Sequence, residues 1–138
     1  MWDTGGMELT LNLGMPPSSN TYYRSVPGKG VLISKRGREY RKEVIERCRE
    51  YAGTYPADAR LNVLVVLRPP DRRRRDIDNF CGKALLDSLM AAEIIPDDSQ
   101  VDSLTMLRAG IDKVNPGVTV YLSTIDAHAK ELYAELQL

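Results

Sequence analysis

The sequence predicts a single α/β domain with the order β-α-β-α-β-β, in which helices pack on one face of a mixed sheet. Its valine-rich segment 61–67 has the composition of a buried central strand. Segments 34–51 and 79–92 place apolar residues at helical spacing, and three further segments have strand character. This order is typical of an α/β sandwich, and 138 residues are enough for one domain with a sizeable core.

The first half of the chain supplies one strand and one helix. Apolar and polar residues alternate over 8–13, as in a half-buried strand, and turn residues then begin a loop that runs to about Ser34. Ser34 is the expected cap of a helix that reaches about Tyr51 and ends at Gly53. Its expected buried face consists of Tyr40, Val44, Ile45, Cys48 and Tyr51.

The second half supplies the remaining strands and the second helix. The helix over 79–92 is expected to have Asp78 or Asn79 as its cap and a wide apolar stripe against the core. Strands over 101–109 and 118–122 are expected to pair as a hairpin.

The ends of the chain fall outside this pattern. We expect the domain to span 8–125, between a flexible N-terminus at 1–7 and a helical tail at 126–138. The two cysteines match neither a metal-ligand spacing nor a disulfide framework, which favours a reducing cytoplasm. No apolar run approaches the roughly 20 residues of a membrane span, so no membrane partner is expected.

Charge is unevenly distributed although the net charge is zero. Residues 24–75 contain 15 Lys/Arg and six Asp/Glu, whereas residues 76–138 contain four and 11. A polyanion responds to the local field, so the basic half is a candidate phosphate-binding surface. The single histidine, His128, and the lack of Gly-x-Ser-x-Gly or Gly-rich phosphate loops argue against acyl-transfer and NTPase chemistry.

The most informative segment is Asp71–Asn79, where four arginines precede two carboxylates. Arg72, Arg73, Arg74 and Arg75 carry guanidinium groups that bind phosphate bidentately. In extended backbone, Asp76 and Asp78 point the same way, and paired carboxylates bind hard divalent cations. Metal-assisted attack on a phosphodiester uses both features, although loop and cap residues paired with arginines remain the alternative.

Two further groups of residues belong to the candidate site. Asp97 and Asp98 precede a predicted strand, and adjacent side chains in extended backbone point apart, so we expect only one to reach a metal. Lys83 is placed to stabilise negative charge on a phosphate, with an ion pair to Asp87 as the competing role.

The loop over 17–24 combines hydroxyls, an amide, two phenols and a guanidinium. Such groups contact phosphate and sugar, and phenols stack on exposed bases. Turn formation by Asn and Ser, with Tyr22 or Tyr23 in the core, is the competing explanation.

Three segments, 16–24, 70–79 and 97–101, together resemble the RusA-type Holliday-junction resolvases, and the likeness extends over roughly 8–125. The resemblance implies a small homodimeric endonuclease, common in phages and prophages, that cuts four-way DNA junctions with Mg²⁺ or Mn²⁺. It implies catalytic carboxylates at Asp76, Asp78 and Asp98, with Lys83 as the counterpart of a functional lysine. The expected DNA-binding residues are Asn20, Tyr23, Arg24, Arg72, Arg73, Arg74, Arg75 and Asn79.

The chain departs from the family pattern in front of this lysine. Three residues, rather than the usual two, separate Asn79 from Lys83. One extra helical residue rotates a side chain by about 100°, which an irregular first turn at Gly82 would absorb.

These observations predict a Mg²⁺-dependent, structure-selective endonuclease whose metal is held by Asp76, Asp78 and Asp98, with Asp97 in support. A non-catalytic protein that binds branched DNA remains an alternative. A phosphodiesterase for small substrates is the third, and the size of the basic surface argues against it.

Overall fold

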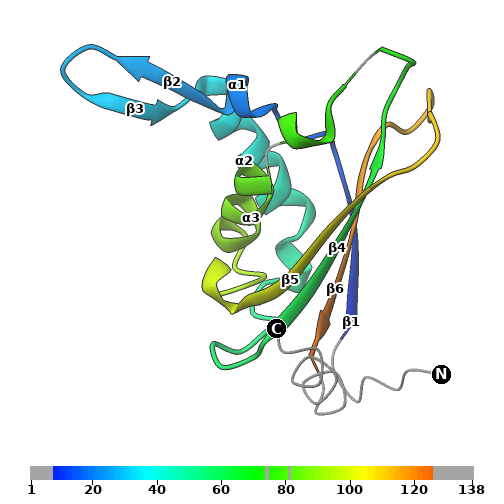
Figure 1. The fold of residues 1–138 in the computed structure, drawn as a ribbon. Helices are drawn as coiled ribbons and strands as arrows, with labels where there is room; N and C mark the ends of the chain where they lie inside the picture. The colour runs from blue at the N-terminus through cyan, green and yellow to red at the C-terminus, as the bar shows by residue number, and fades with distance from the viewer. Residues whose placement is uncertain (1–7, 74, 81, 126–138) are drawn as a thin grey trace, which may run out of the picture.

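The computed structural model describes residues 8–73, 75–80 and 82–125 (Figure 1). The main elements are β1 (Glu8–Leu13), α2 (Lys35–Arg47), β4 (Leu61–Arg68), α3 (Gly82–Ala91), β5 (Val101–Arg108) and β6 (Gly117–Thr124). Over the described residues, these strands form one mixed sheet in the spatial order β1-β6-β4-β5, and α2 and α3 lie on one side of it (Figure 1). The predicted fold class is therefore confirmed.

Strand β4 occupies the middle of the sheet, as its valine-rich sequence predicts. It pairs in parallel with β5 and antiparallel with β6. Leu61, Val63, Val65 and Leu67 are buried in the core that includes residues of both helices, while the intervening side chains are only half-buried. Burial along β4 thus alternates, and the strand is covered closely on one face only.

The hairpin predicted from residues 101–109 and 118–122 is wrong, because β4 lies between β5 and β6. Each of these strands pairs with β4, whose side chains are the most apolar in the sheet and gain most from a central position. The connection between β5 and β6 passes the end of β4, where Ala109 N donates to Leu67 O and Asp112 N to Pro69 O.

Helix α2 begins as predicted but ends earlier. The Oγ of Ser34 accepts a hydrogen bond from Gly37 N at 3.1 Å, which confirms the cap. The helix ends at Arg47, and a 3₁₀ turn, η1 (Arg49–Tyr51), follows it. Tyr40, Val44 and Cys48 are buried and Ile45 is partly buried, whereas Tyr51 is 36% exposed and does not belong to the buried face.

The predicted loop to Ser34 contains structure that the sequence analysis missed. A short helix, α1 (Ser19–Tyr22), is followed by an antiparallel hairpin of β2 (Tyr23–Val26) and β3 (Gly30–Ile33). The hairpin projects away from the sheet and helices (Figure 1). Gly28 and Gly30, at its turn, both have φ of +78°, a conformation that glycine adopts without a steric penalty.

The start of α3 also differs from the prediction. Neither Asp78 nor Asn79 caps it, because the backbone first forms a separate 3₁₀ turn, η2 (Ile77–Asn79), with Asp76 as N-cap. Phe80 is extended and bridges to Ser18, and α3 begins only at Gly82. The extended arrangement assumed for residues 76–78 is therefore wrong, because Asp78 lies within the turn.

A third 3₁₀ turn, η3 (Asp98–Gln100), precedes β5 and contains a buried polar anchor. Asp97 and Gln100 form a capping box in which Asp97 N donates to Gln100 Oε1 at 3.0 Å. The Gln100 amide nitrogen donates to Pro56 O at 2.8 Å and Ala59 O at 3.0 Å, and the residue is 3% exposed. Gln100 therefore ties this turn to the segment before β4.

Predictions for residues 1–7, Arg74, Cys81 and 126–138 lie outside the described residues. Within the described part, no helix combines the length and hydrophobicity that membrane spanning requires.

We predict that Gly37→Ala destabilises the protein, although alanine favours helix. A Cβ at Gly37 would lie 2.8 Å from Tyr22 Cδ1 and from Ile33 Cγ2, so these side chains would have to move. Overpacking should lower the free energy of unfolding by about 1–3 kcal/mol, more than the ~1 kcal/mol gained in helix propensity. Urea denaturation measures the difference, with exposed Glu46→Ala in the same helix as control. A stabilised Gly37→Ala variant would contradict the packing described.

We predict a second loss of stability for Gln100→Ala. The substitution leaves the carbonyls of Pro56 and Ala59 without their amide donor and removes half of the capping box. The free energy of unfolding should fall by about 1–3 kcal/mol in the same urea experiment. An unchanged midpoint and slope would show that Gln100 does not anchor the turn.

Candidate functional site

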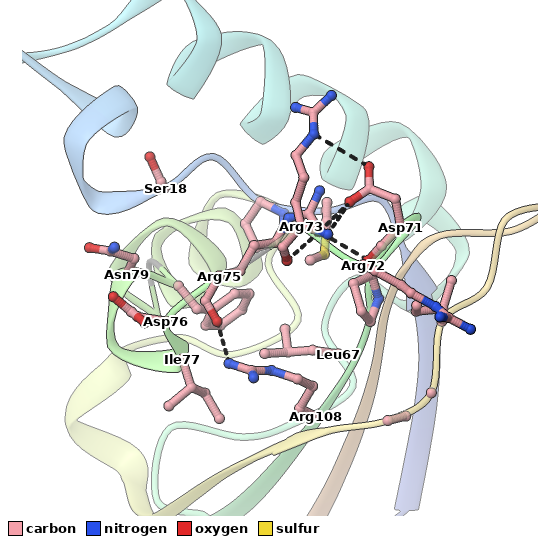
Figure 2. A pocket seen from close by; sticks show the side chains of 17 residues that line it. Ser18, Leu67, Asp71, Arg72, Arg73, Arg75, Asp76, Ile77, Asn79 and Arg108 are labelled. Atoms are coloured by element: carbon pink, nitrogen blue, oxygen red, sulfur yellow. Dashed lines mark hydrogen bonds and ion pairs between the residues drawn. The ribbon is translucent and has the colours of Figure 1, made fainter.

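A cleft of about 1410 Å³ opens beside the end of β4 and is lined by four arginines (Figure 2). We call Arg72, Arg73, Arg75 and Arg108 the arginine cleft. Asp71, Asp76 and Asn79 also line it, together with apolar side chains such as Leu67 and Phe80. The predicted arginine segment thus lines a concave surface, although Arg74 lies outside the described residues.

Asp71 organises the arginines of this segment. Its Oδ1 accepts hydrogen bonds from the Arg73 backbone N at 2.9 Å and from Arg75 Nη1 at 2.8 Å. These bonds, that of Arg75 first, hold the pKa of the Asp71 carboxyl below its usual range. Arg72 and Arg73 remain exposed, so their guanidinium groups are accessible to an anion.

Arg108 is a cleft residue that the sequence analysis missed. It ends β5, and its Nη2 donates to the backbone oxygen of Arg75 (Figure 2). In the parallel pair of β4 and β5, Arg108 is in register with Leu67, so both strand ends reach the cleft. The sequence analysis paired β5 with β6, and this wrong pairing did not place Arg108 near the arginine segment. A parallel pair of β4 and β5 would have predicted that Arg108 lies beside Leu67.

Asp76 and Asn79 lie on the η2 side of the cleft (Figure 2). Asp76 has extended backbone, and its carbonyl oxygen accepts a hydrogen bond from Asn79 N at 3.1 Å. The side chain of Asp78 lies outside the described residues.

Lys83 approaches two carboxylates. Its Nζ is 3.1 Å from Asp87 Oδ1 and 3.6 Å from Asp98 Oδ2. The hydrogen bond and attraction of Asp87, with a smaller contribution from Asp98, raise the pKa of Lys83. Lys83 therefore lies beside Asp98, although three residues separate it from Asn79 in the sequence. The ion pair with Asp87 that was considered for Lys83 is present, and the role of Lys83 as a site residue stays a prediction.

The neighbouring acids Asp97 and Asp98 interact with each other and make different further contacts. The Asp97 Oδ1 accepts a hydrogen bond from Ser99 N at 3.2 Å, and this bond is the main reason that the pKa of Asp97 is lowered. Asp98 instead faces Lys83. The structure thus gives Asp97 a capping role and places Asp98 at the lysine.

The carboxylates have the right chemistry for a hard divalent cation, since Mg²⁺ prefers oxygen ligands. Among the described side chains, however, no three Asp, Glu, His or Cys residues are grouped closely enough to hold a metal ion. Asp76 lines the arginine cleft, whose described lining includes neither Lys83 nor Asp98. Lys83 and Asp98 are the members of the predicted set that the structure brings within ion-pair distance.

The loop before the hairpin separates into buried and exposed residues. Tyr22 is fully buried, while Asn20, Tyr23 and Arg24 are exposed. The rings of Tyr22 and Tyr23 meet edge to face, with centroids 4.8 Å apart. Tyr23 also contributes to the electrostatic environment of Lys83, so the root of the hairpin lies near the lysine.

The sequence analysis also missed the residues behind Asp87. Tyr22 Oη donates to Asp87 Oδ2 at 2.9 Å, and Arg41 Nη2 donates to Tyr22 Oη at 3.1 Å. The i,i+4 spacing of Lys83 and Asp87 predicted their ion pair from the sequence. No local sequence pattern predicts the contact of Tyr22 with Asp87, which is 65 residues away.

Comparison with known proteins identifies the family. The family model "Endodeoxyribonuclease RusA" matches residues 14–123. The chain is 42% identical over 96 residues to the crossover junction endodeoxyribonuclease rusA of Enterobacteria phage HK97, covering 70% of this chain and 78% of the relative. It is 32% identical over 104 residues to crossover junction endodeoxyribonuclease RusA of Escherichia coli K12, covering 75% and 85%. The chain belongs to the endodeoxyribonuclease RusA family.

Proposed function

We propose that this protein is a metal-dependent endonuclease that resolves four-way DNA junctions by paired phosphodiester hydrolysis. The approach of Lys83 to Asp98, within the segment that matches the family model, is the observation on which the proposal chiefly depends. The relatives with 42% and 32% identity are named crossover junction endodeoxyribonucleases.

In this proposal Asp76, Asp78 and Asp98 hold Mg²⁺, for which Mn²⁺ can substitute. When bound, the cation supplies an activated water and neutralises negative charge in the transition state. Asp97 supports the set indirectly, because its cap fixes the turn from which Asp98 extends. Lys83 brings a fixed positive charge to the scissile phosphate and stabilises the charge that develops there.

The arginine cleft and the exposed loop bind the DNA backbone in this proposal. Arg72, Arg73, Arg75 and Arg108 present guanidinium groups suited to bidentate phosphate contacts. Arg74 extends this run in the sequence, and Asn20, Tyr23, Arg24 and Asn79 add polar and stacking groups. Such contacts position the substrate without reading its sequence.

Paired cutting implies two active sites. A four-way junction has approximate twofold symmetry, and a C₂ homodimer presents two equivalent sites to it. We therefore include homodimer formation, and action in the cytoplasm of a bacterial or phage-infected cell, in the proposal.

We predict that the protein nicks a synthetic four-way junction symmetrically in the presence of Mg²⁺ and leaves a linear duplex of the same sequence intact. Asp98→Asn should reduce cutting to background while junction binding persists, because it removes a ligand and not a phosphate contact. Denaturing gels of end-labelled junctions measure cutting, and mobility shifts in EDTA measure binding.

The matched control is Asp102→Asn, an acid of β5 that pairs with Arg60 and lies outside the candidate site. It should cut like the parent protein. If the parent protein binds junctions but does not cut them with any divalent cation, the non-catalytic junction-binding alternative is favoured instead.

We predict that the double variant Arg72→Ala, Arg73→Ala weakens junction binding most at low salt. Each lost phosphate contact should reduce the slope of log K against log salt by about 0.9. Fluorescence anisotropy over a salt series measures the slope. Arg60→Gln, at the opposite end of β4, serves as control, and an unchanged slope in the double variant would remove the arginine cleft from the binding surface.

A further inference from the structure

Asp87 of α3 is a nearly buried acid, and both of its carboxylate oxygens are engaged. Its side chain is only 12% exposed. Oδ1 lies 3.1 Å from Lys83 Nζ, whereas Oδ2 accepts the hydroxyl of Tyr22 at 2.9 Å and lies 3.8 Å from Arg41 Nη2. Three elements, α1, α2 and α3, therefore meet at one carboxylate.

The groups that hold Asp87 are themselves fixed. Tyr22 is fully buried and packs with Ala84 and Ile33. Burial raises the pKa of Tyr22 to about 12, so its hydroxyl keeps its proton and remains a donor to Asp87. At Gly37, the absence of a side chain allows α2 to approach the Tyr22 ring.

Arg41 completes this arrangement. Its Nη2 donates to the Tyr22 hydroxyl at 3.1 Å, and its charge compensates that of Asp87. The Nε of Arg41 is buried and has no hydrogen-bond partner among the described residues, which is an unfavourable position for a guanidinium nitrogen. The fold thus keeps Arg41 at a cost in hydrogen bonding, in contact with the Tyr22–Asp87 pair.

Lys83 differs from Tyr22, Arg41 and Asp87 because its side chain is 55% exposed. A lysine on an exposed helix face has many rotamers, and its ammonium group would otherwise be distributed over a wide volume. Among the side chains that the structure describes, the charged or titratable neighbours of Lys83 are Asp87 on its own helix, Asp98 on η3 and Tyr23 on β2. Of the two acids, Asp87 is the closer and by far the less exposed.

We propose that Asp87 is a positioning residue, held by Tyr22 and Arg41, that directs the ammonium group of Lys83 toward Asp98. Asp87 lies behind the lysine and acts through it. This inference rests on the proposed function for its catalytic consequence, whereas the ordering of Lys83 by Asp87 does not depend on catalysis.

An ordinary i,i+4 surface pair is the competing explanation, and the chain contains one for comparison. Lys35 and Glu39 on α2 are 3.9 Å apart and 84% and 53% exposed. A pair of that kind orders its lysine weakly. The Lys83–Asp87 pair is shorter, and its acid is anchored from two other helices.

The test compares Asp87→Asn, Asp87→Glu and Tyr22→Phe with the parent protein and with Asp102→Asn. Under single-turnover conditions, Asp87→Asn should lower the junction-cutting rate by at least about tenfold, because a misplaced catalytic group loses rate steeply. The junction Kd measured in EDTA should not change. Asp87→Glu should restore part of the rate, and Tyr22→Phe should lower it less than Asp87→Asn does.

A double-mutant cycle separates positioning from a general structural role. In a Lys83→Ala background, Asp87→Asn should cause no further loss of rate, since Asp87 acts through the missing lysine. An equal loss in both backgrounds would overturn the inference. If Asp87→Asn does not fold by circular dichroism, Tyr22→Phe takes its place in the cycle.

A second readout is independent of cutting. The chain has six lysines, so the ammonium signal of Lys83 can be assigned in ¹⁵N spectra by comparison with Lys83→Ala. Its order parameter should exceed that of Lys35 in the parent protein and fall in Asp87→Asn. An unchanged order parameter would overturn the inference even if the protein cuts junctions. A parent protein that fails to cut would instead refute the proposed function, while the ¹⁵N measurement still decides the role of Asp87.

Discussion

The parallel pairing of β4 with β5 is the constraint on which the site depends. Two strands that run in the same direction cannot be joined by a tight turn, so the chain must cross from one end of the sheet to the other. The crossover over residues 69–100 contains η2, α3 and η3, and with them every predicted metal ligand and the lysine proposed for catalysis. The fold therefore positions the proposed chemistry through one connection, and packing α3 against the sheet fixes that connection.

The acids of this connection make different polar contacts and therefore have different roles. Asp71 arranges arginine side chains, Asp97 caps a turn, and Asp87 contacts a buried phenol. Asp98 faces the lysine instead. Residues of one chemical type, close together in the sequence, thus have different roles because each meets a different set of donors. Composition alone cannot distinguish these roles.

The sequence predicted the features that depend on local pattern. The β4 strand, the Ser34 cap and the burial of Tyr40 and Val44 all follow from periodicity or from a single side chain. The sequence analysis was wrong about features that depend on pairing between distant segments. Strand β6 pairs with β4 instead of β5, and the 16–34 segment, expected as a loop, contains α1 and a hairpin. In the site, the association of Lys83 with Asp98 followed from motifs, whereas Tyr22, Arg41 and Arg108 approach it only through tertiary contacts.

The step from α1 to the hairpin has a mechanical consequence. Tyr22 contacts Asp87, and Tyr23, the next residue, begins β2. A planar peptide bond leaves only two soft torsions between them, ψ of Tyr22 and φ of Tyr23. The other end of the hairpin is tied to the same place, because Ser34 N donates to Tyr22 O at 2.8 Å. When the projecting hairpin bends about its root, those two torsions must therefore change. If they do not, the bending shifts the Tyr22 phenol and with it the Asp87 carboxylate.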